Sequence, residues 1–363
     1  MNKGDISTDL TWVDMLKGIA IIGVFFLHWL AYMKPSTSPE PVYSVVKIFQ
    51  FAVGPFVQVF FILSGFGLTI TYLQHDKVDW SWQKWIWRRV TKIVVPYEMV
   101  VILSFLLGML GSYLYETVQV RFSWSSLLAF LTFTQNFYPP SWIWNPPLWF
   151  MPVIIGLYAC FPILLGILRK SGTWALLFVS LTVTYGTLAI ASLAGYTGGH
   201  NNDLFTFWLF QFVLGMVLAY ERWRNPQRLR ILVSSRAFAF GIGLVMCSWA
   251  LRTYVPLGKV FNDSLTSIGV FLVLLNAGWV IRARIPAVGK SLNALSGKSY
   301  LMYLIHFPVM VFLVGPPLRV TMNPIIVVVL GVVYISFIFF LCNFISRPVN
   351  KFTSLLYGYA AAD

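Results

Sequence analysis

The residues best placed to do chemistry are a histidine and a lysine in the first long apolar stretch of the chain. His28 lies near the middle of this stretch, and Lys17 precedes it by eleven residues. Eleven residues make almost three helical turns at about 100° per residue, so both side chains lie on one face. A rise of ~1.5 Å per residue puts His28 roughly 16 Å beyond Lys17, near the midplane of a ~30 Å hydrocarbon layer. Ionisable groups at that depth are costly and usually functional, so the shared face predicts a joint site.

A simpler interpretation stays open for each of the two residues. Lys17 could end a helix and extend its ammonium group to the membrane surface. His28 could be a neutral packing residue that is hydrogen-bonded within the bundle. Asp14 precedes Lys17 by three residues, so the two can pair, and a carboxylate also suits a helix N-terminus.

Few other side chains could act as a base, a nucleophile or a hydrogen-bond donor inside the membrane. Of the four histidines, His75 and His200 fall in predicted loops and are expected to be solvated. His306 is the second candidate after His28, and a hydrogen bond to a neighbouring helix would explain it equally well. Ser64 and Ser299 are intramembrane hydroxyls that could donate hydrogen bonds. Because Gly65 follows Ser64, that pair could equally be a small-residue contact between helices.

A cluster of cations precedes the third apolar stretch. Arg89 and Lys92 are spaced i,i+3, and Arg88 and Lys92 are spaced i,i+4, so a short helix could project them together. Arginine offers a planar fork and lysine a point charge, which together suit a diphosphate. Three tryptophans interleave with these cations and could stack on a nucleobase or anchor at the lipid headgroups: Trp82, Trp85 and Trp87. The alternative is an ordinary basic loop with an aromatic belt.

Composition places the chain in a membrane. It has 363 residues, 58% of them hydrophobic and only 10% charged, with a mean hydropathy of +0.75. Soluble domains carry about 25% charged residues. The net charge of +14 does not indicate a nucleic-acid partner, because the basic residues fall in the gaps between apolar stretches, where they set topology. Three dispersed cysteines favour neither a disulfide framework nor a metal cluster, and no metal site is expected.

Ten apolar runs are long enough to span a bilayer, each needing about 20 residues. They are residues 17–33, 47–74, 93–115, 146–168, 173–195, 204–221, 237–256, 264–281, 299–316 and 324–345. The run at 127–134 is too short and is expected to be re-entrant or interfacial. The first run lacks a small-residue cleavage site after it, so we expect it to be a retained helix. The sequence thus predicts an all-α bundle of about ten transmembrane helices, forming one membrane domain over residues 1–363.

The distribution of basic residues predicts the orientation. Ten spans put both termini on one side, and the segments on that side hold 20 of the 26 Lys and Arg residues. This asymmetry predicts that both termini are cytoplasmic, in a multi-pass protein of the cytoplasmic (inner) membrane.

Four blocks of sequence resemble the membrane acyltransferase-3 family. They are Asp14–Ala20 with His28, Phe60–Phe66, Arg88–Lys92 and Gly297–Pro308. The first block is similar to the family's signature, in which an Arg or Lys is followed by ten residues and a His. The fourth block contains Ser299, Tyr300, Tyr303 and His306. Leu148–Phe150 also fits. The blocks extend from the first predicted helix to the ninth, and their order and spacing together are specific. Lys17 and Lys92 stand where the family commonly has arginine, and Ser346 stands where many relatives have glutamate.

The resemblance implies an integral membrane enzyme that transfers an acyl group, often acetyl, from acyl-CoA to an extracytoplasmic carbohydrate or lipid-linked glycan. It implies catalytic roles for His28, Lys17, Ser64 and His306, and donor binding by Arg88, Arg89 and Lys92. Acetyl-CoA would be a substrate, and no permanently bound cofactor is expected. His28 could be the general base or a transient acyl carrier.

The acceptor sugar would approach an external, proline-rich loop whose aromatic residues suit the apolar faces of sugars and equally suit a membrane interface: Phe137, Tyr138, Trp142 and Trp144. Two other functions compete with the transferase. A transporter or flippase of a lipid-linked or small polar substrate would share the intramembrane His and Lys, but should show related, helix-broken halves, which the sequence lacks. A scaffold with a decayed site is disfavoured because Lys17 and His28 are both present.

Overall fold

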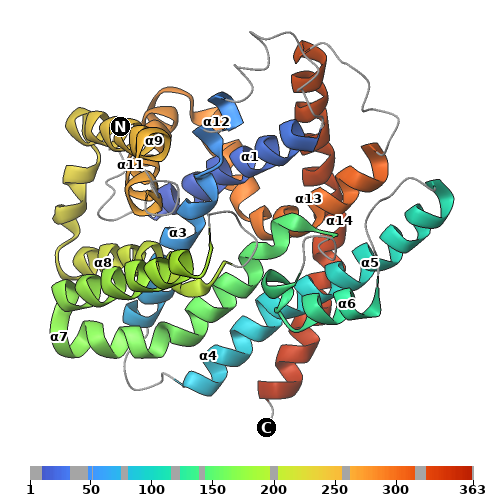
Figure 1. Ribbon diagram of the computed structural model, residues 1–363, viewed down its shortest axis with the longest axis horizontal. Coiled ribbons are helices and arrows are strands. Elements are labelled where there is room, and N and C mark those ends of the chain that lie inside the picture. The colour runs from blue at the N-terminus through green and yellow to red at the C-terminus, as the bar shows by residue number, and fades with distance from the viewer. Residues whose placement is uncertain are drawn as a thin grey trace. The chain divides into compact units, whose positions relative to one another are not determined.

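A computed structural model describes residues 10–32, 48–50, 52–74, 81–115, 123–138, 144–196, 203–255, 262–314 and 324–361. His75, His200, Trp142 and both chain ends lie outside these ranges. The described residues form helices and connecting turns with no strand, so the predicted all-α fold is confirmed (Figure 1). The longer helices are α1 (Thr11–Tyr32), α3 (Phe56–Gln74), α5 (Val95–Tyr115), α7 (Phe150–Leu193), α8 (Leu209–Arg224), α9 (Ser235–Tyr254), α11 (Asp263–Arg284), α13 (Ser299–Val314) and α14 (Pro324–Ala361).

The helices agree well with the predicted spans. Seven helices in the described ranges are long and apolar enough to cross a membrane, and Ser299–Leu313 forms a shorter apolar helix. The chain is therefore a multi-pass membrane protein, while the count of ten spans stays a prediction. Helix α7 covers two predicted spans, and its φ of 84° at Gly172 interrupts the helix where the sequence separates them. Glycine adopts such a left-handed conformation without steric strain.

The short segment predicted at residues 127–134 is a short helix. Helix α6 spans Trp124–Leu131, eight residues, and begins with a capping box in which Ser123 and Ser126 satisfy each other's backbone N–H groups. A helix of that length reaches only ~12 Å and cannot cross a bilayer. Phe133, with a φ of 56°, ends this element before the 3₁₀ turn η3 (Gln135–Phe137).

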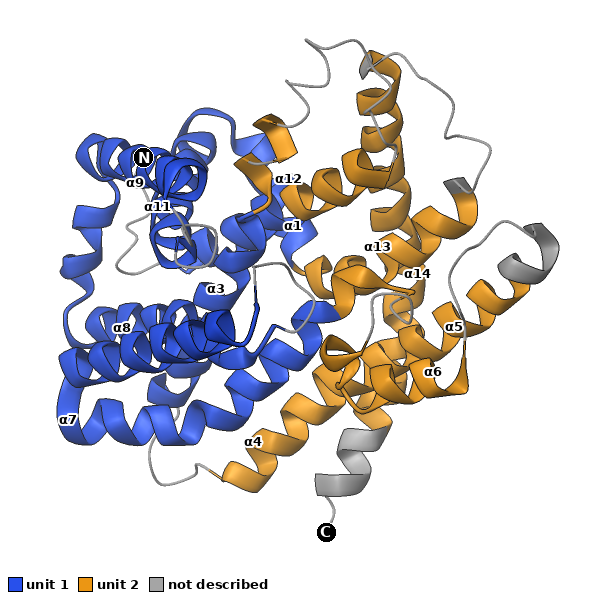
Figure 2. Ribbon diagram, in the orientation of Figure 1, with its two compact units in different colours: residues 1–21, 55–75, 149–296 blue, residues 22–54, 76–148, 297–363 orange. Residues whose placement is uncertain are grey.

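The chain divides into two compact units, coloured separately in Figure 2. Unit 1 comprises residues 1–21, 55–75 and 149–296, and unit 2 comprises residues 22–54, 76–148 and 297–363. Unit 1 is centred on α3, α7, α8, α9 and α11. Unit 2 contains the C-terminal part of α1 with α5, α6, α13, α14, the short helix α4 (Trp82–Arg89) and the π-helix η2 (Val90–Val94).

In unit 1, helices α3 and α8 pack with their backbones in contact. A Cβ added to Gly65 would lie 1.9 Å from the carbonyl oxygen of Phe212, and one added to Gly215 would lie 1.8 Å from that of Ile62. Each helix therefore needs a glycine where the other helix crosses it. This contact favours the small-residue interpretation of the Ser64–Gly65 pair, as in other membrane helix pairs.

We expect Gly65→Ala to destabilise the protein, because a methyl group there must push α8 away from α3. Forcing an extra carbon into a packed core typically costs about 1–3 kcal/mol. Thermal unfolding in detergent should show a lower midpoint for Gly65→Ala. Gly67→Ala is the matched control on the same helix, since a Cβ there meets nothing within 4 Å. Equal midpoints for the two variants would contradict the close contact.

In unit 2, residues 22–32 of α1 pack against α14. The indole N–H of Trp29 donates to the carbonyl oxygen of Val327 over 2.8 Å, and the Trp29 ring stacks on Tyr334 with ring centres 5.2 Å apart. Gly331 lies beneath the same indole, because a Cβ there would come within 3.0 Å of it. These contacts fix the side of α1 that carries His28.

Candidate active site

Two histidines meet in unit 2. Nδ1 of His28, on α1, lies 3.0 Å from Nε2 of His306, on α13. His306 is 1% exposed, whereas His28 is half-buried. On the other side of the His306 ring, Nδ1 lies 2.6 Å from the carbonyl oxygen of Tyr303, one turn earlier on α13. The structure therefore brings together two of the four residues predicted to be catalytic.

Hydrogen-bond requirements determine which nitrogen carries the proton on each ring. The carbonyl oxygen of Tyr303 can only accept, so Nδ1 of His306 must donate. Because an unpaired buried charge is costly, His306 is neutral, and its Nε2 must then accept from His28. His28 consequently donates from Nδ1, so Nε2 is the nitrogen of this ring that can gain or lose a proton while the hydrogen bond to His306 is kept. This relay makes Nε2 of His28 the basic atom of the pair.

Two tyrosines hold His306 in place, and only one of them, Tyr303, belongs to a sequence block noted above. The hydroxyl of Tyr334, on α14, donates to the carbonyl oxygen of His306. The hydroxyl of Tyr303 donates to the carbonyl oxygen of Pro147, and so ties α13 to the segment before α7. Phe25 packs on the His306 ring with centres 5.0 Å apart. The place of Tyr303 in the Gly297–Pro308 block was the sequence signal for this support, whereas Tyr334 had none.

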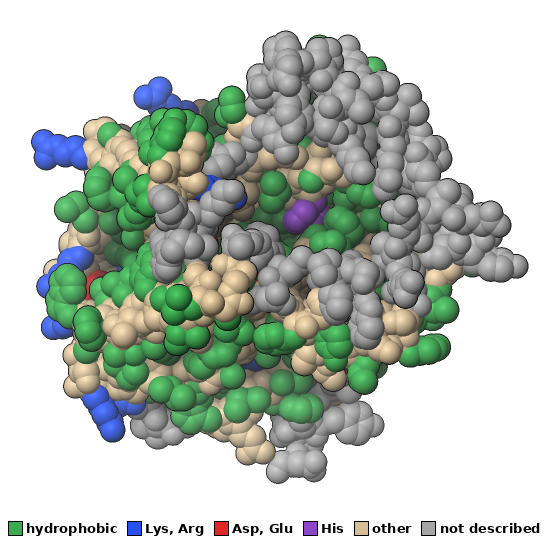
Figure 3. Space-filling model, in the orientation of Figure 1, with side chains coloured by type: hydrophobic (Ala, Val, Ile, Leu, Met, Phe, Trp, Pro, Cys, Tyr) green, Lys and Arg blue, Asp and Glu red, His purple; other side chains and the backbone are tan. Residues whose placement is uncertain are grey.

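The environment of the pair is apolar. Figure 3 shows histidine atoms at one face of the molecule among hydrophobic side chains, and His28 is the partly exposed member of the two described histidines. Phe307 lies edge-on to His28, with ring centres 6.2 Å apart. Apolar walls lower the local dielectric and strengthen the hydrogen bonds of the pair.

The other two predicted catalytic residues lie in unit 1. Lys17 forms the predicted ion pair with Asp14, with Nζ 3.5 Å from Oδ1. The same carboxylate oxygen accepts from the hydroxyl of Ser296 over 2.9 Å. Ser64 is half-buried on α3, beside the glycine contact with α8. Because Lys17 and His28 belong to different units, their joint site stays a prediction.

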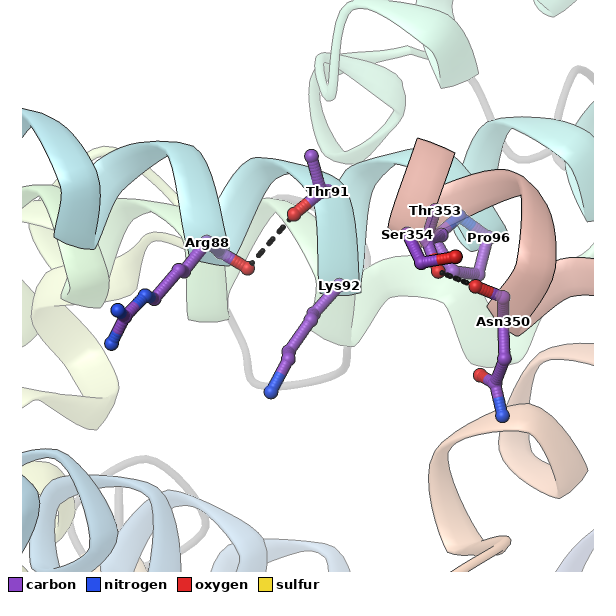
Figure 4. Close-up of a pocket in the computed structure, with 7 residues that line it drawn as sticks. All are labelled: Arg88, Thr91, Lys92, Pro96, Asn350, Thr353 and Ser354. Carbon is purple, nitrogen blue, oxygen red and sulfur yellow. Dashed lines mark hydrogen bonds between the residues drawn. The ribbon is translucent and has the colours of Figure 1, made fainter. Parts of the chain in front are cut away.

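A second feature of unit 2 is a cationic pocket of about 580 Å³, which is within the usual range for ligand sites. Its lining residues are Arg88, Thr91, Lys92, Pro96, Asn350, Thr353 and Ser354. Figure 4 shows that the side chains of Arg88 and Lys92 extend side by side into the same space. Arg89, which the sequence paired with Lys92, instead has its guanidinium 5.9 Å from the centre of the Trp85 ring.

The pocket forms at a local irregularity of the helix. Lys92 lies in the π-helix η2, which joins α4 to α5 without a break. Single π turns inside α-helices are rare and often occur at functional sites. The Arg88 side chain, from the end of α4, and the Lys92 side chain, from η2, line the same pocket. The hydroxyl of Thr91 donates back to the carbonyl oxygens of Trp87 and Arg88.

Helix α14 supplies the other wall of the pocket, which sequence reasoning missed. Asn350, Thr353 and Ser354 lie near the end of this 38-residue helix. One turn before Asn350, the hydroxyl of Ser346 accepts a hydrogen bond from Lys298 over 2.7 Å. Ser346 thus provides a neutral partner for a lysine. Ser299, the other intramembrane hydroxyl considered, is buried at the start of α13.

The aromatic residues expected at the acceptor differ in exposure. Phe137 and Tyr138 are exposed, whereas Trp144 is buried and packs on Phe130 with ring centres 4.3 Å apart. Trp144 therefore belongs to the core of unit 2, and of these three described residues Phe137 and Tyr138 present an aromatic surface.

Comparison with known proteins identifies the class of this helical membrane protein. A family model described as an acyltransferase domain, of the acyltransferase-3 type, matches residues 10–353. The chain belongs to this family. Acyltransferase MdmB of Streptomyces mycarofaciens is 26% identical over 278 residues, which cover 70% of this chain and 67% of that relative. No solved structure matches the chain.

Proposed function

We propose that this acyltransferase moves an acyl group, acetyl by default, from acyl-CoA to a hydroxyl group of an extracytoplasmic carbohydrate. The observation that carries the proposal is the relay from the Tyr303 carbonyl through His306 to His28, because it orients a base and defines its basic atom. Base catalysis at a hydroxyl group is what O-acylation needs.

The donor assignment is supported by the charge of unit 2. Its described residues include seven Lys and Arg side chains but a single carboxylate, that of Glu98. The seven are Lys84, Arg88, Arg89, Lys92, Lys298, Arg347 and Lys351. Such an excess attracts a polyanion, and CoA carries a diphosphate and a 3′-phosphate. Arg88 and Lys92 project into the pocket and would bind these phosphates.

The chemical step follows from the relay. The acceptor oxygen attacks the thioester carbonyl carbon while Nε2 of His28 takes the hydroxyl proton. The C–S bond then breaks, the CoA sulfur leaves as a thiolate, and the proton on His28 passes to it. His306 keeps Nδ1 of His28 hydrogen-bonded throughout, so that Nε2 can accept the proton. The cytoplasmic side of the donor and the inner-membrane location rest on the distribution of basic residues.

The test is the glycan profile of cells with and without this protein, read for O-acyl groups by mass spectrometry, together with acetyl transfer by the purified protein. We expect O-acyl groups that disappear with the gene and do not return with His28→Gln. An unchanged glycan profile and no consumption of acetyl-CoA would defeat the proposal.

A further inference from the structure

The two walls of the cationic pocket differ in hydrogen-bonding character. The wall from α4 and η2 carries the charged donors of Arg88 and Lys92. The wall from α14 is neutral and consists of Asn350, Thr353 and Ser354. A ligand that fits both walls is anionic on one side and neutral, with hydrogen-bonding groups, on the other.

The hydroxyl groups of the neutral wall act as acceptors. Thr353 donates its hydroxyl proton to the carbonyl oxygen of Asn350 over 3.0 Å, as Figure 4 shows. Ser354 donates its own to the carbonyl oxygen of Lys351 over 2.8 Å. Each hydroxyl has one proton, so both oxygens offer lone pairs to the pocket. Phosphate oxygens are acceptors too and are poorly matched to this wall, whereas amino and hydroxyl groups of a ligand match it.

Asn350 supplies the specific contact. Its side-chain amide extends into the space that Arg88 and Lys92 enter (Figure 4). An amide presents a donor and an acceptor side by side, which matches the N6 amino group and N7 of adenine. We infer that the neutral wall recognises the adenine of the acyl-CoA donor, with Asn350 as the residue that determines specificity, while Arg88 and Lys92 bind the phosphates.

The length of α14 is consistent with a nucleotide site in water. Its 38 residues extend for ~57 Å, nearly twice a ~30 Å hydrocarbon layer. A helix of this length exceeds the ~20 residues that span a bilayer, so we expect the segment after Pro348, where Asn350 and Ser354 are exposed, to lie outside the hydrocarbon layer and within reach of a soluble nucleotide. The inference rests on the proposed use of acyl-CoA and adds the residue that would select the nucleobase.

The experiment compares CoA with 1,N6-etheno-CoA, in which a ring bridges N1 and N6 and removes the amino donor. Equilibrium competition against radiolabelled CoA on the purified protein gives both affinities. The wild type should bind CoA about 5- to 100-fold more tightly than the etheno derivative, which is the usual discrimination provided by an amide side chain that makes two hydrogen bonds to adenine. Asn350→Leu should lose this preference and keep its affinity for 4′-phosphopantetheine, which has no adenine.

Asn343→Leu is the matched control, because it makes the same change on α14 outside the pocket lining. It should retain the preference for CoA. A wild type that binds both ligands equally, or an Asn350→Leu variant that still discriminates, would overturn the adenine assignment alone. A wild type that binds neither CoA nor phosphopantetheine would overturn the donor proposal and this inference with it.

Discussion

Replacing His28 with glutamine is expected to reduce acyl transfer about 100- to 10,000-fold, the usual contribution of a general base. Glutamine keeps polarity near the position of Nε2 but cannot take up a proton near neutral pH. His28→Ala should be equally inactive. A packing histidine would behave differently, because glutamine would preserve much of its hydrogen bonding. The measurement is acetyl transfer per mole of well-folded protein, with folding followed by the detergent-extracted yield.

The partner histidine provides an internal control for this prediction. The amide oxygen of His306→Gln can still accept from Nδ1 of His28, so the variant should retain much more activity than His306→Phe, which has no acceptor. Near-normal turnover by His28→Gln would defeat the catalytic assignment. Equal activities for the two His306 variants would show that the relay does not orient the base.

The second large effect is expected from Arg88→Gln combined with Lys92→Gln. The double variant should weaken CoA binding on the order of 10- to 100-fold, because two charge-assisted contacts are lost from exposed side chains. Affinity for pantetheine, which has no phosphate, should not change. Raising the ionic strength should weaken CoA binding by the wild type more than by the double variant, because salt screens the charges of Arg88 and Lys92, which the double variant lacks.

Two comparisons make the result specific to the pocket. Lys84→Gln with Lys351→Gln removes the same charge from unit 2 outside the pocket lining and should cost much less affinity. Arg89→Gln should have a smaller effect than Arg88→Gln, because Arg89 lies over Trp85. If Arg89 proves the more important arginine, the assignment of Arg88 is wrong. If CoA affinity is unchanged in the double variant, these basic residues serve only to orient the protein in the membrane.

The positions of the helices could be predicted from the sequence better than the contacts between their side chains. Hydrophobic runs of spanning length located the helices, and even the break at Gly172 falls between two predicted spans. His28 and His306 stood out as ionisable groups in apolar helices. Their hydrogen bond could not be predicted, because it depends on how α1 packs against α13, 278 residues apart in the chain.

The residues that line the cationic pocket were harder to predict from the sequence than the helices. Arg88 and Arg89 are adjacent, and an ideal α-helix allows either to approach Lys92, so only the observed π turn favours Arg88. Asn350, Thr353 and Ser354 are common residue types on the last helix, and no periodicity separates them from ordinary exposed polar residues. A pocket whose walls come from two helices far apart in the chain leaves no local signal in the sequence.

The π turn η2 also bears on how this family can diversify. A π turn is an α-helix that has gained one residue, and its wider turn accommodates that residue so that α4 and α5 form one continuous helix. Removing one residue between Arg88 and Lys92 would restore a regular α-helix and change the spacing of these two side chains from i,i+4 to i,i+3. Insertions and deletions between Trp85 and Pro96 should therefore change the shape of the pocket more abruptly than point substitutions do.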